Sequence, residues 1–371
     1  MYRNSWIEID VDALRDNVKT LKAQTQKKFI AVIKANGYGN GDVAIAKVCV
    51  ESGADMLAVS SLDEALSIRH AGIDAELLIL GYVDPMHLGV CVKENITVTA
   101  VSLDWVKMAL QQECSGLKVH LKVDTGMNRI GFKDVQELKC GIELLKKGHV
   151  QMSGIFTHFA CSDDAGHQMT DRQMKLFEEI VTSLNREFEW IHCSNSDATV
   201  SYKESFSNAV RCGLAMFGTT SYPTELKPVM SLYTKIIHVK KVPAGQTVGY
   251  GATYTTKEDE IIATVPIGYA DGWIRNHQGR KAYVNGHEAE FVGRICMDQA
   301  MLRLKHWEDV GTLVELIGDH ISLGRVAQEL QTIPYEVMTL LSDRLTKVYK
   351  RSGSYSDAFT PRFEKVEELD V

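Results

Sequence analysis

The first two-thirds of the chain repeat one pattern, a short apolar run followed by an amphipathic segment that ends at glycine. Helices are predicted over 42–52, 62–71 and 135–147, and each is followed by a glycine, the residue that helix C-termini favour. Strands are predicted at 56–60, 77–80, 119–123, 154–157, 190–193 and 210–217. Repeated strand–helix units over roughly 220 residues predict a parallel (β/α)8 barrel. A doubly wound sheet is the alternative, but no G-x-G-x-x-G motif follows an early strand to favour it.

The pattern changes near Pro228, where strands and turns replace the alternation. Strands are predicted at 234–242, 261–267 and 312–317, and Asn285-Gly286 predicts a tight hairpin. The opening segment 6–10 alternates apolar and polar residues and is expected to pair with this second region. We therefore predict a (β/α)8 barrel over 10–230 and a C-terminal, mostly β domain built from 1–9 and 231–371.

Composition excludes several classes of protein. The 371 residues carry a formal net charge of -7 with no basic stripe, which argues against a nucleic-acid partner. No apolar run approaches the ~20 residues of a membrane span, and the N-terminus lacks the apolar stretch of a signal peptide, so a cytoplasmic location is expected. The eight cysteines are scattered without paired spacing, which predicts reduced thiols and no metal site.

One lysine carries the strongest chemical signal. The apolar run 29–33 ends at Lys34, and a glycine-rich turn follows at once. In a barrel, this order places an amine at the carboxyl end of a strand, where ligands bind. Burial there lowers the pKa of a lysine, and a neutral amine can form a Schiff base. The alternative is a lysine that only ends the strand and points into water.

Three other predicted strands lead into polar groups, and a fourth contains one. Arg129 can bind a carboxylate as a two-pronged donor, whereas His158 alone is more typical of a structural hydrogen bond. Ser196 and the glycine of Arg211-Cys212-Gly213 offer a hydroxyl and a backbone amide of the kind that hold phosphate. Each motif is weak by itself, and their shared position at strand ends on one barrel face is the better evidence.

Three turns of the second region complete the set, at 248–254, 266–273 and 292–299. From Trp6 to about Tyr349, the motifs and their order resemble the alanine racemases, pyridoxal 5'-phosphate enzymes of the barrel-plus-β-domain type. The resemblance implies that Lys34 forms the Schiff base and acts as the base on one face of the substrate Cα. It implies that Tyr250, supplied by the partner subunit, is the base on the opposite face. A homodimer with shared active sites is therefore expected.

The resemblance also assigns the remaining site residues. The implied catalytic set is Lys34, Tyr250, His158 and Arg211. The implied cofactor contacts are Lys34, Tyr38, Ser196, Arg211, Gly213, Leu214 and Tyr335. The implied substrate-binding residues are Arg129, Met297, Lys122, Asp298 and Tyr269. Arg211 resembles the partner of the pyridine nitrogen, which would stay unprotonated and so suppress transamination. Lys122 matches a lysine that is carbamylated in some members.

The predicted function is interconversion of L- and D-alanine, supplying D-alanine for peptidoglycan. A serine racemase, the catalytic domain of a membrane-linked enzyme, is the alternative; the bulky Tyr335 favours alanine. A non-catalytic pyridoxal-phosphate carrier lacks an equivalent of Tyr250, and a barrel decarboxylase would need an acidic residue in place of Arg211. The chain departs from the family pattern at Gly37, where alanine is usual, and at Asn40, where histidine is usual. It also departs after Val337, where it reads Met338-Thr339, and at 344–347, where Arg-Leu-Thr-Lys replaces the usual Arg-x-Pro-Arg.

Overall fold

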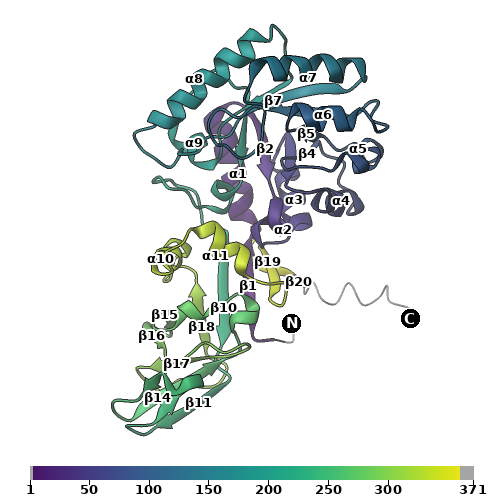
Figure 1. Ribbon diagram of the computed structural model, residues 1–371. Coiled ribbons are helices and arrows are strands. Elements are labelled where there is room, and N and C mark those ends of the chain that lie inside the picture. The colour runs from purple at the N-terminus through teal and green to yellow at the C-terminus, as the bar shows by residue number, and fades with distance from the viewer. Residues whose placement is uncertain (1–2, 360–371) are drawn as a thin grey trace, which may run out of the picture. The chain divides into compact units, whose positions relative to one another are not determined.

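The computed structural model describes residues 3–359. The chain folds into two compact units (Figure 1). One contains the described parts of Met1–Ala13, Tyr38–Asn40 and Pro228–Val371, and the other contains Leu14–Gly37 and Gly41–Lys227. Tyr38–Asn40, at the end of the turn that begins with Lys34, thus belong to the same unit as the C-terminal part of the chain.

The second of these units is a parallel barrel. Its strands are β2 (Lys28–Val32), β3 (Met56–Val59), β4 (Leu77–Ile79), β5 (Val98–Ala100), β6 (Lys118–Lys122), β7 (Gln151–Phe156), β8 (Trp190–His192) and β9 (Ala209–Cys212). They pair in chain order, all parallel, and β9 returns to pair with β2. A parallel bridge between Leu78 and Thr97 joins β4 to β5. The predicted barrel is confirmed.

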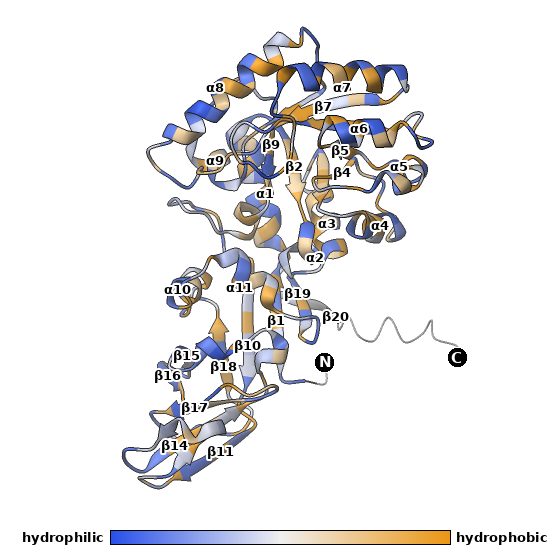
Figure 2. Ribbon diagram, in the orientation of Figure 1, coloured by the Kyte–Doolittle hydropathy of each residue, from blue (hydrophilic) through white to orange (hydrophobic). Residues whose placement is uncertain are grey.

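Helices surround these strands. They are α1 (Val11–Thr25), α3 (Asp42–Glu51), α4 (Leu62–His70), η1 (Pro85–His87), α5 (Leu88–Lys93), α6 (Leu103–Ala109), α7 (Val135–Lys147), α8 (Gln168–Ser183) and α9 (Ser196–Ser201). Figure 2 shows hydrophobic strands inside and helices such as α7 and α8 with mixed surfaces outside. This is the distribution that a barrel covered by amphipathic helices requires. The predicted strand over 210–217 is wrong in its second half, because β9 ends at Cys212 and a 3₁₀ turn, η2 (Leu214–Phe217), follows.

The other unit is built on a ten-stranded sheet. Its strands are β1 (Ser5–Asp10), β10 (Met230–Lys235), β11 (His238–Val242), β14 (Glu260–Val265), β15 (Lys281–Val284), β16 (His287–Phe291), β17 (Ala300–Leu304), β18 (Leu313–Ile317), β19 (Thr346–Arg351) and β20 (Ser354–Phe359). The remaining elements are β12 (Thr247–Val248), η3 (Tyr250–Ala252), β13 (Tyr254–Thr255), η4 (Tyr269–Asp271), η5 (Arg275–His277), α10 (Leu323–Glu329) and α11 (Pro334–Leu340). A mostly β composition is confirmed.

Local predictions for this unit have mixed outcomes. The opening strand β1 pairs with β10 and β19, as expected. Asn285 and Gly286 both have positive φ angles between β15 and β16, so the tight hairpin is confirmed. The single strand predicted over 234–242 is two strands, because β10 ends at Lys235 and β11 begins at His238. Within the described residues, no helix has both the length and the apolar character of a membrane span.

Candidate active site

Lys34 opens an unusual turn at the carboxyl end of β2. The four residues after it, 35–38, have φ angles of 53°, 54°, 60° and 55°, so α2 (Lys34–Tyr38) turns in the left-handed sense. The Gly37 amide donates to the Ile33 carbonyl at 2.9 Å across this turn. A left-handed turn is costly for every residue except glycine, so strain is stored directly beside the lysine. The carboxylate of Glu64 anchors its start by accepting the Ala35 amide at 2.8 Å.

The Lys34 amine is held in conditions that favour its neutral form. Burial lowers the pKa of Lys34, and the charge of Arg129 lowers it further, while Glu64 opposes them. The Nζ atom makes no hydrogen bond or ion pair with a described residue. Lowering the pKa raises the fraction of the amine that is neutral, which is the form that acts as a nucleophile and a base. The alternative of a lysine that simply points into water does not fit this environment.

Arg211, in β9, is a buried cation whose hydrogen-bond acceptors are all neutral. Its Nη1 donates to His192 Nδ1 at 2.8 Å, and its Nη2 has three acceptors, the carbonyls of Thr157 and Cys193 at 2.9 Å and His158 Nδ1 at 3.0 Å. Burial lowers the pKa of Arg211 to about 10, so it stays charged at neutral pH. Its Nε–H makes no hydrogen bond with a described residue and is left for a ligand.

The contact with Arg211 fixes the protonation of His158. A guanidinium only donates, so His158 Nδ1 must accept and the ring proton must lie on Nε2. Burial lowers the pKa of His158 well below its ordinary value, and the charges of Arg211, Arg129, Lys122 and Lys34 lower it further. His158 is therefore a neutral ring whose Nε2–H can donate to an anionic oxygen.

Ser196 begins α9 and faces the turn after β9. Its hydroxyl oxygen accepts the amides of Gly213 at 3.0 Å and Ala215 at 3.2 Å. Because the oxygen already accepts two bonds, its own hydrogen is directed to a further acceptor. The Leu214 amide, the first of η2, donates to no described residue. A hydroxyl and a backbone amide are thus both available to an anion such as phosphate.

Arg129 and Lys122 flank a tight loop after β6. Asp124 holds this loop by accepting the amides of Gly126 and Asn128, both at 3.0 Å. Arg129 is exposed and forms no ion pair or hydrogen bond with a described residue. Lys122 is buried and donates to the Val123 carbonyl at 2.7 Å. Burial, with help from Arg211, lowers the pKa of Lys122 to about 7.

The predicted residues of the other unit lie on exposed turns. Tyr250 is 70% exposed on η3, Tyr269 is 42% exposed, and Met297 is 53% exposed. Tyr38 and Tyr335 lie together, with ring centroids 5.9 Å apart. A tyrosine that is 70% exposed contributes little to the core of its own chain.

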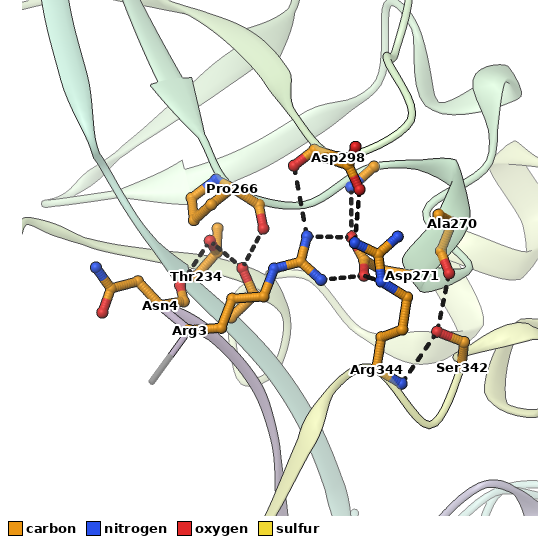
Figure 3. Close-up of polar contacts among 11 residues, drawn as sticks. Arg3, Asn4, Thr234, Pro266, Ala270, Asp271, Asp298, Ser342 and Arg344 are labelled. Atoms are coloured by element: carbon orange, nitrogen blue, oxygen red, sulfur yellow. Dashed lines mark hydrogen bonds and ion pairs between the residues drawn. The ribbon is translucent and has the colours of Figure 1, made fainter. Parts of the chain in front are cut away.

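A cluster of four charged side chains supports the turns that carry Tyr269 and Met297 (Figure 3). Asp271 is fully buried, and both of its carboxylate oxygens accept hydrogen bonds from Arg3. Arg344 Nε lies 3.4 Å from Asp271 Oδ1, and Arg344 Nη2 donates to Asp298 Oδ1 at 2.5 Å. The amides of Tyr269 and Ala270 donate to the Cys296 and Met297 carbonyls, both at 3.0 Å, which joins the two turns. We call Arg3, Asp271, Asp298 and Arg344 the Asp271 cluster.

The structure brings the barrel set together. The charges of Arg211, Arg129, Lys122 and Lys34 all act on His158, while Ser196, Gly213 and Leu214 meet at the end of β9. Tyr38, Tyr250, Tyr269, Met297, Asp298 and Tyr335 lie in the other unit. Sequence reasoning missed His120, His192, Glu64 and Asp271. A histidine within β6 and another at the end of β8 were the available signal for the first two.

These features define an enzyme of the barrel-plus-β-domain class, with a half-buried lysine of lowered pKa after one barrel strand and a buried arginine in another. Comparison with known proteins gives the family. The model for the N-terminal domain of alanine racemase matches residues 9–221, and the model for its C-terminal domain matches residues 229–349. The chain belongs to the alanine racemase family.

Individual relatives agree with this assignment. An alanine racemase of Streptococcus equi subsp. equi is 42% identical over 363 residues, which is 94% of this chain and 99% of the relative. The crystal structure of alanine racemase from Bacillus anthracis with bound L-Ala-P has a TM-score of 0.94 and 37% identity, covering 98% of this chain and 99% of that one. A histidine racemase from Leuconostoc mesenteroides has a TM-score of 0.88 and 31% identity, covering 94% and 98%. The fold therefore accommodates more than one amino acid.

Proposed function

We propose that the protein interconverts L- and D-alanine with pyridoxal 5'-phosphate, in the cytoplasm, and that the product supplies peptidoglycan synthesis. The observation that carries the proposal is the environment of Lys34, a half-buried amine with a lowered pKa that lies within range of an unpaired Arg129. An amine acts on the substrate Cα while a nearby guanidinium holds the carboxylate. This is the minimum set for an amino-acid substrate.

The barrel residues fit the cofactor. The Ser196 hydroxyl hydrogen and the Leu214 amide are available to its phosphate, Arg211 Nε–H to its ring nitrogen, and Lys34 to its aldehyde carbon. An arginine keeps its own proton, so the ring nitrogen would remain unprotonated. When bound, the cofactor supplies an electron-accepting ring that stabilises negative charge at the substrate Cα. All four contacts use atoms without an acceptor or partner among the described residues.

Racemisation needs proton transfer on both faces of the substrate Cα. We assign one face to Lys34, which can take up or return a proton because its pKa is lowered. We assign the other face to Tyr250 of the partner subunit, because the Tyr250 side chain is 70% exposed on its own chain. His158 Nε2–H would donate to the Tyr250 oxygen, and the charge of Arg211 behind it would favour the phenolate.

Mixing two inactive variants tests the shared site. Lys34→Ala removes one base and Tyr250→Phe the other, so each homodimer should lose activity. A heterodimer of the two variants would contain one site with both wild-type residues. Unfolding and refolding an equal mixture should then restore about a quarter of wild-type activity, if subunits pair at random. No recovery, with dimers formed, would contradict the assignment of Tyr250 to the partner.

The substrate itself needs a direct comparison. Tyr335 lies beside Tyr38, with ring centroids 5.9 Å apart, and the relatives at 42% and 37% identity are alanine racemases. We therefore expect alanine to be racemised faster than serine, and histidine slowest. Initial rates with the three L-amino acids, on one cofactor-loaded preparation, test this order. A serine preference would support the alternative function predicted from sequence, and a histidine preference would align the chain with the Leuconostoc mesenteroides enzyme.

A further inference from the structure

A row of hydrogen bonds runs from Arg211 into the core of the barrel. Arg211 Nη1 contacts His192 Nδ1 at 2.8 Å, and His192 Nε2 contacts His120 Nδ1 at 2.9 Å. Both histidines are fully buried, on β8 and β6. The row ends at His120 Nε2, a buried nitrogen that has no hydrogen-bond partner among the described residues. A buried polar atom left unpaired in a packed core calls for a physical explanation.

The direction of these bonds follows from the donor at their start. Because Arg211 can only donate, His192 Nδ1 accepts and the proton of His192 lies on Nε2. That proton is donated to His120 Nδ1, so the proton of His120 lies on its own Nε2. Burial lowers the pKa of His120 to about 3 and that of His192 well below its ordinary value, and the charge of Arg211 lowers both further. Both rings are therefore neutral, and each has a single permitted tautomer.

We propose that His120 is a positioning residue of the active site, which fixes the ring orientation of His192 and through it the guanidinium of Arg211. Without His120, the Nε2–H of His192 would be an unpaired buried donor, and rotation of that ring would remove the acceptor from Arg211 Nη1. The unpaired His120 Nε2–H is the end of a row that begins with a cation and contains no anion. This inference rests on the role proposed above for Arg211.

The packing around His120 supports the same conclusion. A Cβ atom at Gly154, on β7, would lie 2.6 Å from Cδ2 and Nε2 of the His120 ring. Glycine inside a strand often marks a place where another group approaches closely, and here that group is His120. Phe156, two residues along β7, stacks on His192 with ring centroids 4.6 Å apart and planes 9° apart. One strand thus positions both rings.

Three variants separate hydrogen bonding from packing. His120→Asn keeps an acceptor for His192 Nε2–H, His120→Leu removes it, and Gly154→Ala displaces the ring without changing any polar group. Thr99→Val is the matched control, because Thr99 is a fully buried barrel residue whose hydroxyl donates to the Ile79 carbonyl, outside the row. Circular dichroism and thermal unfolding confirm that each variant is folded.

We expect kcat to fall about tenfold in His120→Leu and Gly154→Ala with KM little changed, because misplacing a group that contacts the reacting system lowers turnover. His120→Asn and Thr99→Val should stay near wild type. Equal losses in His120→Asn and His120→Leu would reduce the role of His120 to filling space and overturn the proposal. So would wild-type kcat in a folded His120→Leu protein.

A spectroscopic measurement is independent of racemase activity. In protein labelled with 15N-histidine, the ring nitrogens of His192 should show a protonated Nε2 and an unprotonated Nδ1. The Nε2–H signal should shift in His120→Leu and not in Thr99→Val. A protonated Nδ1 on His192 would overturn the proposed row. If the wild-type protein racemises no amino acid, the proposed function fails, while these spectra still decide the arrangement of the row.

Discussion

Two buried charged groups of this molecule, Arg211 and Asp271, have opposite kinds of hydrogen-bond partner. In the barrel, the Arg211 cation has only neutral acceptors, two carbonyls and two histidines. In the other unit, the Asp271 anion is paired with Arg3 and lies 3.4 Å from Arg344 (Figure 3). The first arrangement leaves positive charge unbalanced within the described residues, and the second balances its anion within the chain.

We interpret Arg211 as a charge that a bound ligand balances, and Asp271 as a charge that stabilises the fold. A buried charge without a counterion is costly unless something else compensates it. The positive charge of Arg129 also acts on Arg211, so an anionic cofactor and a substrate carboxylate would be the missing partners. The Asp271 cluster needs none. Mutations should therefore affect activity in the barrel and stability in the cluster.

Arg211→Met should have the largest effect on turnover. It removes the donor to His192, His158 and two carbonyls, and it leaves the proposed contact with the ring nitrogen empty. We expect kcat to fall about 10³-fold, equivalent to roughly 4 kcal/mol of activation free energy. Steady-state racemisation rates for alanine measure this directly.

Arg211→Lys is the matched variant, because it keeps the charge and loses the planar fork of donors. It should retain more activity than Arg211→Met but remain well below wild type. If both folded variants stayed within a few-fold of wild type, Arg211 would be no more than a core residue, and the contrast with Asp271 would disappear.

Asp271→Asn should have the largest effect on stability. It leaves Arg3 and Arg344 facing a neutral amide, and breaking a buried ion pair from one side costs about 3 kcal/mol. Urea unfolding at a fixed protein concentration measures this loss. Asp298→Asn is the control, since that carboxylate is 54% exposed and an exposed pair contributes about 1 kcal/mol or less. Equal losses in the two variants would show that burial does not set the strength of the cluster.

The sequence predicted the barrel and its polar strand ends because their signals are local. Lys34 and His158 each follow an apolar run, and parallel strands bring such ends to one face. The Asp271 cluster has no such signal. Arg3 and Asp271 are 268 positions apart, and nothing in either segment specifies the other. His120 was missed for another reason, since a histidine inside a barrel strand does not indicate which residue it will contact.

Lys122 should give the barrel a distinctive pH dependence. Its pKa falls from 10.5 to about 7 on folding, so between pH ~7 and ~10 the unfolded chain binds a proton that the folded chain does not. The free energy of unfolding should therefore rise with pH across this window, by up to about 1.4 kcal/mol per unit from this one group, and be lowest below pH ~7. Lys122→Met should flatten the curve. Unfolding free energies of wild type and Lys122→Met, measured in CO2-free buffer at three pH values, test this prediction. If both proteins showed the same dependence on pH, the lowered pKa of Lys122 would be contradicted.

The same neutral amine is the form that reacts with CO2. We expect intact mass measured with and without bicarbonate to show carbamylation that Lys122→Met abolishes. A carbamate would turn Lys122 into an anion near the positive charges of Arg211 and Arg129, and so would reduce the charge imbalance that distinguishes the barrel from the Asp271 cluster. If no mass were added at pH 8, only the cofactor and the substrate would remain to balance the positive charge of the barrel.

The left-handed turn after Lys34 should show the smallest effect, and it tests whether the barrel site also stores backbone strain. Gly37 adopts φ +60°, where an alanine costs about 1 kcal/mol, and its Cβ would lie 3.1 Å from Ile45. Gly37→Ala should therefore lower the free energy of unfolding by about 1 kcal/mol. Gly89→Ala, in α5 with nothing within 4 Å, should raise it slightly. If Gly37→Ala were neutral, the turn would tolerate the alanine usual at this position without strain, and glycine would give this chain no advantage beside its lysine.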